Sequence, residues 1–269
     1  MRLVLAGMDG LLSALPARAL ARAGHQILGV VVPERPRGRR LLPTGAAQVA
    51  AELGLALVTP PQAADLLAQA GLAVVACFPR RLEPVWWEAP ALGAINVHPS
   101  ALPAYRGPAP LFWQLRDGVR VGAVSIHRLT PALDAGDVLA SVPVDLGQDL
   151  EQSELETRLG RAAGSLLVDL LGGDWPESRP QSAGSYQPWP APDDRILPRT
   201  WTAAHALRFI RGAAGYGPFR LEGDDGPLCV RSARGWAPAA PDPLPRMSAV
   251  RFAQGVLLLG SGDAHPLIR

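Results

Sequence analysis

The chain contains no lysine, so arginine supplies every basic side chain other than the five histidines. Its formal net charge of +2 is too small by itself to predict a nucleic-acid partner. Only two cysteines occur, Cys77 and Cys229, and they lie far apart in the chain. A disulfide framework is therefore not expected, and a reducing cytoplasm is the expected compartment.

Other absences narrow the class of protein further. No apolar stretch is long and uninterrupted enough to span a bilayer, so no membrane association is expected. No Cys/His cluster has the spacing of a zinc site, and we expect no metal. The glycine turn at residues 7–10 lacks the Gly-x-Gly-x-x-Gly pattern, which argues against NAD. With 269 residues, 48% of them hydrophobic, the chain is expected to form one large and one small domain.

Short apolar runs alternate with segments of helical apolar spacing along most of the chain. Thr44 is expected to cap the second helix. The alternation predicts an α/β fold with a Rossmann-like, doubly wound, mainly parallel sheet. Strands are predicted at 2–6, 25–32, 56–58, 73–78, 94–98, 121–128 and 138–144, and helices at 11–23, 44–53, 63–70, 110–116 and 150–171.

A change in composition marks the predicted domain boundary. Residues 172–198 are rich in Pro, Ser and Gly with little periodicity, so we predict domains at 1–172 and 200–269 joined by a linker at 173–199. The second domain should contain a helix at 201–211, capped by Thr200, and short strands within 219–230 and 250–259.

The charge is distributed unevenly between these two parts. From residue 199 onward the chain holds 9 Arg and 5 acidic residues, which gives +4. The first 198 residues hold 17 Arg and 19 acidic residues, which gives −2. A basic C-terminal part is compatible with RNA binding, although the excess is small.

Polar residues follow the predicted strand at 94–98, where it meets a loop. Asn96 and His98 are two positions apart, so on a strand they point to the same face. Pro99 and Pro103 then prevent an immediate helix. Asp134 lies in a later loop that also follows a strand. Since α/β sheets build sites at the ends of buried strands, an amide, an imidazole and a carboxylate here form a candidate catalytic group.

Two motifs give the chain a resemblance to a known family. Residues 96–107 read Asn-Val-His-Pro-Ser-Ala-Leu-Pro-Ala-Tyr-Arg-Gly, and residues 133–136 read Leu-Asp-Ala-Gly. They resemble the motifs Asn-x-His-x-Ser-Leu-Leu-Pro-x-x-Arg-Gly and Leu-Asp-x-Gly of the folate-dependent formyltransferases, except that Ala101 stands where leucine is usual. The resemblance implies transfer of a formyl group from 10-formyltetrahydrofolate to a primary amine. Within this family, the chain most resembles the enzymes of translation initiation, whose acceptor is methionyl-tRNA.

The resemblance implies a role for each member of the candidate catalytic group. Formyl transfer passes through a tetrahedral oxyanion, which requires hydrogen-bond donors aimed at the developing charge. Asn96 and His98 would supply them, and Asp134 would assist proton transfer. Taken singly, His98 could instead be a strand-end histidine bonded to a carbonyl, and Asp134 a turn residue. His127 is interpreted as a core histidine, or one that supports a catalytic residue, rather than as a catalyst.

The resemblance also implies residues that bind the donor and the acceptor. Arg106 and Gly107 either meet the substrate or steer their loop. The basic run at 34–40 resembles the loop with which methionyl-tRNA formyltransferases enter the acceptor stem, and a solvated loop is the alternative. The residues implied to surround the pterin of the folate are Phe78, Arg80, Leu82, Leu129, Leu133 and Gly136. The residues implied to contact the tRNA are Arg37, Arg39 and Arg40.

Other functions fit the same catalytic residues. A small amine such as an amino sugar could be the acceptor, because the C-terminal segment resembles only a reduced oligonucleotide-binding-like β domain. Water could also replace the amine, as in a formyltetrahydrofolate hydrolase. A homologue that only binds folate is disfavoured by the intact Asn96, His98 and Asp134. The oligomeric state and the pathway within one-carbon metabolism stay open.

Overall fold

The chain divides into two compact units. The computed structural model describes residues 1–8, 10–33, 45–147, 149–223, 226–239, 249–260 and 262–266. One unit comprises Met1–Pro110, Gly122–Asp145 and Glu156–Gln187, and the other comprises Leu111–Val121, Leu146–Leu155 and Pro188–Arg269. The domain ranges 1–172 and 200–269 stay a prediction.

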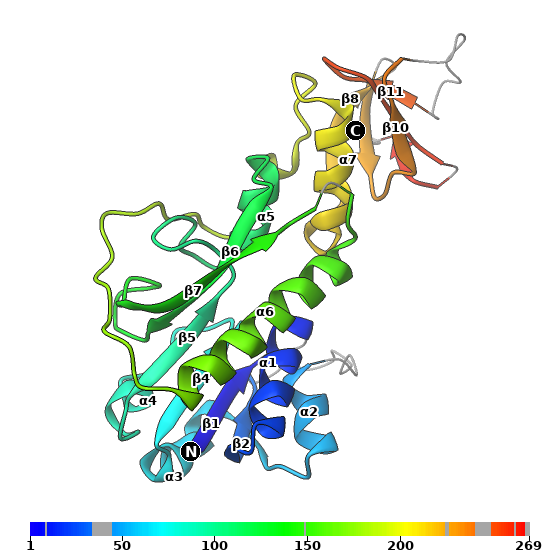
Figure 1. Cartoon of the computed structure of the whole chain (residues 1–269). Coiled ribbons are helices and arrows are strands. Elements are labelled where there is room, and N and C mark those ends of the chain that lie inside the picture. Colours follow the sequence, from blue (N-terminus) through cyan, green and yellow to red (C-terminus); the bar gives the residue numbers. More distant parts are fainter. Residues whose placement is uncertain are drawn as a thin grey trace. The chain divides into compact units, whose positions relative to one another are not determined.

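A seven-stranded sheet of order β3-β2-β1-β4-β5-β6-β7 is the centre of the first unit (Figure 1). The pairs β1·β2, β2·β3, β1·β4 and β4·β5 are parallel, whereas β6 runs antiparallel to β5. This order confirms the predicted Rossmann-like sheet. The strands are β1 (Arg2–Gly7), β2 (Gln26–Val31), β3 (Leu57–Val58), β4 (Leu72–Ala76), β5 (Ala94–His98), β6 (Val121–Arg128) and β7 (Val138–Asp145).

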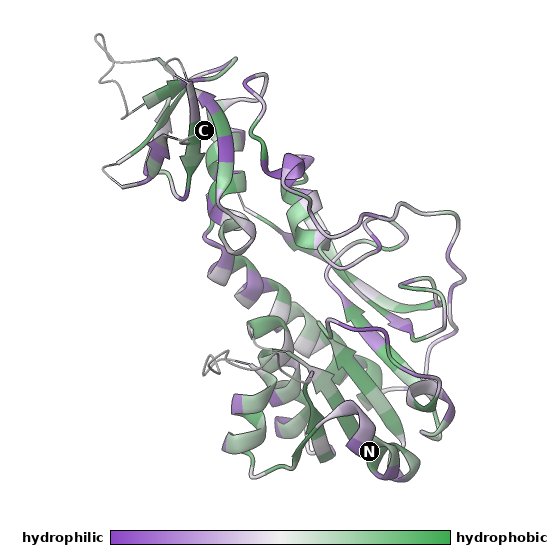
Figure 2. Cartoon of the chain, turned by 180° about the vertical axis from the view of Figure 1, so that it is seen from behind, coloured by the Kyte–Doolittle hydropathy of each residue, from purple (hydrophilic) through white to green (hydrophobic). Residues whose placement is uncertain are grey.

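Helices cover both faces of this sheet. Alternate residues of β1 and β4 point to opposite faces, so Leu5 and Val74 pack toward α1, while Val4 and Val75 join a cluster with Trp86 of α4. Because both faces are buried, these strands are almost entirely apolar (Figure 2). The helices with residues in this unit are α1 (Leu11–Arg22), α2 (Ala46–Glu52), η1 (Pro60–Ala63), α3 (Ala64–Gln69), α4 (Val85–Glu88) and α6 (Gln152–Gly172).

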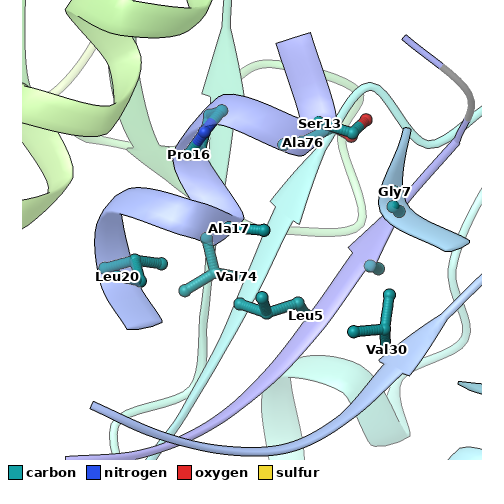
Figure 3. A pocket seen from close by; sticks show the side chains of 11 residues that line it. Leu5, Gly7, Ser13, Pro16, Ala17, Leu20, Val30, Val74 and Ala76 are labelled. Carbon is teal, nitrogen blue, oxygen red and sulfur yellow. The ribbon is translucent and has the colours of Figure 1, made fainter. Parts of the chain in front are cut away.

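A small space between α1 and the sheet is a packing gap rather than a ligand site (Figure 3). Its volume is about 10 Å³, and the side chains around it are mostly Leu, Val and Ala. Such a volume holds one water at most. Ser13, the polar side chain of the lining, is already bonded: its Oγ–H donates to Ala76 O (2.7 Å) and its Oγ accepts from Met8 N–H (3.1 Å).

The second unit contains the predicted small β domain. Two three-stranded antiparallel sheets have the orders β13-β9-β8 and β10-β12-β11. Its strands are β8 (Phe219–Gly223), β9 (Gly226–Val230), β10 (Gly235–Ala237), β11 (Ala249–Arg251), β12 (Val256–Leu258) and β13 (Ala264–Pro266). Its helical segments are α5 (Pro110–Arg116), η2 (Asp193–Arg195), α7 (Ala203–Gly212) and η3 (Ala214–Tyr216).

Four helix starts differ from the predictions, by one residue for α3 and by two residues for α2, α6 and α7. Thr200 does not cap α7, because the helix begins at Ala203 and the Thr202 hydroxyl accepts from His205 N–H (3.1 Å). The helix predicted from residue 44 begins at Ala46, and Thr44 lies outside the described residues. In the part of the chain that the structure describes, no helix is both long and apolar enough to cross a membrane.

Candidate active site

The structure brings the three candidate catalytic residues together within the first unit. Asn96 and His98 lie on β5, and Asp134 lies in the loop between β6 and β7. Asn96 Nδ2 donates to Asp134 Oδ1 across 3.3 Å, and His98 Nδ1 lies 3.8 Å from Asp134 Oδ2. His98 and Asp134 are buried. An amide, an imidazole and a carboxylate thus meet in one small region at the carboxyl end of β5.

The His98 ring is oriented by the loop that follows it. Its Nε2 lies 2.8 Å from Tyr105 O, and a carbonyl oxygen can only accept, so Nε2 carries the proton. In the neutral ring, Nδ1 therefore presents a lone pair on the side of Asp134. Burial lowers the pKa of His98, and the opposing effects of Asp134 and the Tyr105 carbonyl do not restore it. At neutral pH the ring is neutral, and Nδ1 can accept a proton.

Asp134 is held as a carboxylate by the groups around it. Burial by itself raises the pKa of Asp134, but the nearby His127 and His98 rings and the Gly107 N–H together bring it below its ordinary value. Gly107 N–H donates to Oδ2 across 2.8 Å. The backbone of Asp134 is left-handed, with φ of 51°. An ionised carboxylate therefore faces a neutral imidazole.

His127 contacts this group, in agreement with its interpretation as a histidine that supports a catalytic residue. Its Nδ1–H donates to Arg128 O (2.8 Å), so Nε2 is left to accept from Asn96 Nδ2 (3.1 Å). The same Nε2 lies 3.6 Å from Asp134 Oδ1. Asn96 pairs directly with His127 in the antiparallel register of β5 and β6. Since that register is invisible in a single sequence, the detectable signal was only that His127 shares a strand face with Ser125 and Ala123.

We predict that His127→Leu lowers kcat by roughly ten- to a hundredfold, because a catalytic group displaced by about 1 Å can cost that much. Without the His127 acceptor, the Asn96 amide keeps only the longer hydrogen bond to Asp134 Oδ1 (3.3 Å) and is held less firmly. The measurement is the steady-state rate of formyl transfer. His25→Leu is the matched control, since His25 precedes β2, which lies next to the opposite edge strand of the sheet. An unchanged kcat in His127→Leu would show that Asn96 needs no such support.

Arg106 and Gly107 hold their loop through contacts within the chain. Arg106 Nε and Nη2 donate to Gln181 Oε1 (3.1 and 2.7 Å). Gly107 has φ of 117°, and a Cβ there would lie 2.0 Å from Gln187 O, so only glycine fits. Both glutamines lie in the segment predicted as a linker. These contacts favour the loop-steering alternative for Arg106 and Gly107.

The residues implied for the pterin form two groups in the structure. Phe78, Leu82 and Leu129 are partly buried against the apolar cluster that contains Trp86. Arg80 and Leu133 are exposed instead. A separate observation concerns Gly136, where a Cβ would lie 2.0 Å from Arg128 O, so its place in the fold already requires glycine. The residues implied for the tRNA, Arg37, Arg39 and Arg40, lie outside the described residues.

Comparison with known proteins identifies relatives of the chain. The sequence model of the family described as "Formyl transferase" matches residues 56–171. The methionyl-tRNA formyltransferase of Chloroflexus aggregans is 39% identical over 163 residues, which cover 57% of this chain and 53% of the relative. That match spans about half the length of the relative. The enzyme of the same name from Roseiflexus sp. (strain RS-1) is 32% identical over 234 residues, covering 81% of this chain and 71% of the relative.

A solved structure supports the fold. The N-formyltransferase of Helicobacter canadensis, in complex with folinic acid and dTDP-3-aminofucose, aligns with a TM-score of 0.68 over 96% of this chain and 98% of that chain. Its sequence identity is 13%, so the likeness concerns the fold alone. The family match and the relative from Roseiflexus together show that the chain belongs to the folate-dependent formyltransferase family.

Proposed function

We propose that the protein transfers the formyl group of 10-formyltetrahydrofolate to a primary amine, and that the acceptor is the amino group of methionyl-tRNA. The convergence of Asn96, His98 and Asp134 at 3.3 and 3.8 Å carries the reaction class. The acceptor is supported by the relatives that bear the name methionyl-tRNA formyltransferase, one of them matched over 71% of its length.

The geometry gives each side chain a part in this chemistry. When the acceptor amine attacks the formyl carbon, its nitrogen must lose a proton, and neutral His98 accepts it at Nδ1. The imidazolium that forms lies 3.8 Å from the Asp134 carboxylate, which stabilises it. His98 then donates this proton to the leaving nitrogen of the folate, so that no proton is gained or lost overall.

Asn96 supplies the hydrogen bond to the oxyanion. Both hydrogens of its Nδ2 are engaged, one with His127 Nε2 at 3.1 Å and one with Asp134 Oδ1 at 3.3 Å. The longer bond is the one that the amide exchanges for the developing oxyanion, while the bond to His127 keeps the group oriented. A donor placed in this way stabilises charge that appears only in the transition state.

The pterin of the donor would lie against a partly buried apolar surface. Phe78, Leu82 and Leu129 come from two separate loops and pack on one cluster. Such a surface, with a few polar groups at its margin, is typical of small-molecule sites. We infer that these three side chains bind the donor. Leu133 and Arg80, which are exposed, would contact it from the solvent side.

An acceptor screen tests the proposed function. The purified protein is given 10-formyltetrahydrofolate with methionyl-tRNA, with amino sugars, or with no acceptor, and formyl products and formate are quantified. Formylated methionyl-tRNA is the expected product. Transfer to an amino sugar alone would show that the acceptor is an amino sugar and not methionyl-tRNA. Formate release without an acceptor would indicate a formyltetrahydrofolate hydrolase. Folate binding without turnover would indicate a protein that only binds folate.

The basic run at 34–40 provides a prediction about the acceptor. Replacing Arg37, Arg39 and Arg40 together with glutamine should weaken binding of methionyl-tRNA. It should also reduce the slope of log Kd against log salt by roughly two to three, since each phosphate contact contributes about 0.7–0.9. Filter binding over a salt series measures both. Arg22→Gln, at the exposed end of α1, should change neither. An unchanged affinity and slope in the triple variant would remove this run from the tRNA contact.

A further inference from the structure

Residues 178–187, here called the strap, lie across two loops of the first unit although they have little regular structure. Next to the loop at 102–107, Arg106 N donates to Ser185 O (3.0 Å) and Gln187 N donates to Arg106 O (2.9 Å). Next to the other loop, Arg179 and Val138 exchange two backbone hydrogen bonds of 2.9 Å each. Backbone hydrogen bonds therefore join the strap to both loops.

Gln181 connects these two loops through a single side chain. Its Oε1 accepts from Arg106 Nε and Nη2 (3.1 and 2.7 Å), and its Nε2 donates to Asp134 O (3.0 Å) and Gly136 O (2.6 Å). The guanidinium can only donate and the two carbonyls can only accept, so the partners fix the orientation of the amide. Both hydrogens and the oxygen of Gln181 are thus engaged.

The two loops carry the groups that orient the catalytic pair. Tyr105 O, beside Arg106, accepts the Nε2–H of His98 and thereby directs Nδ1 toward the site. Asp134 has a left-handed backbone, which aspartate adopts less readily than glycine does, so its surroundings help to hold it. The two hydrogen bonds of Gln181 Nε2 fall on this backbone, at Asp134 and at Gly136.

We propose that Gln181 is a positioning residue, which ties the loop of Tyr105 and Arg106 to the loop of Asp134 and so holds the Asp134 carboxylate opposite His98 Nδ1. Gln181 touches no reacting atom, and it acts through the backbone of Asp134 and the guanidinium of Arg106. The kinetic part of the test rests on the proposed function, whereas the spectroscopic part does not.

Two substitutions distinguish the hydrogen bonds of Gln181 to Arg106 from its hydrogen bonds to the carbonyls of Asp134 and Gly136. Gln181→Leu removes all of these hydrogen bonds and keeps a side chain of similar size. Gln181→Glu keeps oxygens for Arg106 but cannot donate to the carbonyls of Asp134 and Gly136. Gln69→Leu is the matched control, because Gln69 is an exposed glutamine that also accepts from an arginine, Arg2 Nη2 (3.2 Å).

In the kinetic measurement, Gln181→Leu and Gln181→Glu should both lower kcat by about tenfold or more, as expected when a catalytic group is misplaced. KM for the folate should stay within about threefold, because Phe78 and Leu82 of the donor surface lie outside the two loops that Gln181 connects. A purely structural role would lower the amount of folded enzyme and leave kcat per folded molecule unchanged. A wild-type kcat in Gln181→Glu would show that the bond to Arg106 suffices, and the proposal would be wrong.

The spectroscopic measurement is the titration of the His98 ring by NMR, assigned by comparison with His98→Gln. The groups that face His98 are Asp134, His127 and the Tyr105 carbonyl, and Asp134 and that carbonyl raise its pKa. Displacing the Asp134 carboxylate in Gln181→Leu should therefore lower the pKa of His98, and Gln69→Leu should not. An unchanged pKa of His98 in Gln181→Leu would overturn the proposal even if the protein transferred no formyl group.

Discussion

Replacing His98 with alanine is expected to lower kcat for formyl transfer by two decades or more, as removal of a general acid–base group commonly does. The variant loses both the proton acceptor at Nδ1 and the imidazolium that would follow. Because the His98 ring makes a single hydrogen bond within the described part of the chain, from Nε2–H to the Tyr105 carbonyl, the fold should survive the change. Single-turnover kinetics with methionyl-tRNA measure the effect, and a loss of only a few-fold would remove His98 from the mechanism.

The pH profile of the wild-type enzyme provides the companion test. Burial lowers the pKa of His98, so the neutral form that accepts a proton persists below the ordinary histidine value of about 6.5. As pH falls through this lowered pKa, Nδ1 becomes protonated and kcat/KM should decline. The midpoint of this acid limb should therefore lie below about 6.5, and the limb should be absent from the residual activity of His98→Ala.

Asp134→Asn is expected to lower kcat by about two decades as well, on the scale of a lost electrostatic stabiliser. The asparagine removes the charge that stabilises the imidazolium at 3.8 Å. Its oxygen can still accept from Gly107 N–H, and asparagine tolerates the left-handed backbone at this position. Thermal unfolding should stay close to that of the wild type, so that the loss of rate reflects chemistry rather than folding.

Asp137→Asn is the matched control for this substitution. Asp137 lies three residues later in the same loop, and its Oδ2 accepts from Ser178 Oγ (2.8 Å), a bond that an asparagine oxygen can still make. We expect its kcat to stay within about threefold of the wild type, as for most substitutions away from the chemistry. Equal losses in Asp134→Asn and Asp137→Asn would mean that the loop, and not the Asp134 carboxylate, matters.

The sheet was predictable because its strands are buried on both faces. The predicted bounds of β5 and β6 agree with the structure, and those of the other strands differ by two residues at most at either end. Helix starts were less predictable. Thr200 and Thr202 both suit the cap of α7, and only the backbone path, which pairs Thr202 with Gln254, selects the second.

The proximity of Asn96, His98 and Asp134 could be predicted because these residues combine strand-end positions with a motif. The contacts that orient them could not. His127 meets Asn96 only through the register of an antiparallel pair, 31 residues apart in the chain. Gln181 meets Asp134 across 47 residues, from a segment whose Pro, Ser and Gly content predicts a linker. In that segment the contacts come from single side chains and isolated backbone bridges, which leave no periodic trace in the sequence.

A double-mutant cycle between His98 and Asp134 tests most directly whether one proton acceptor and one carboxylate act together on a formyl group. Single-turnover rates of formyl transfer to methionyl-tRNA would be compared for the wild type, His98→Ala, Asp134→Asn and the double variant. If the two side chains act as a unit, the double variant should be about as slow as the slower single variant. Losses that simply multiply, or a wild type that transfers no formyl group, would contradict the account.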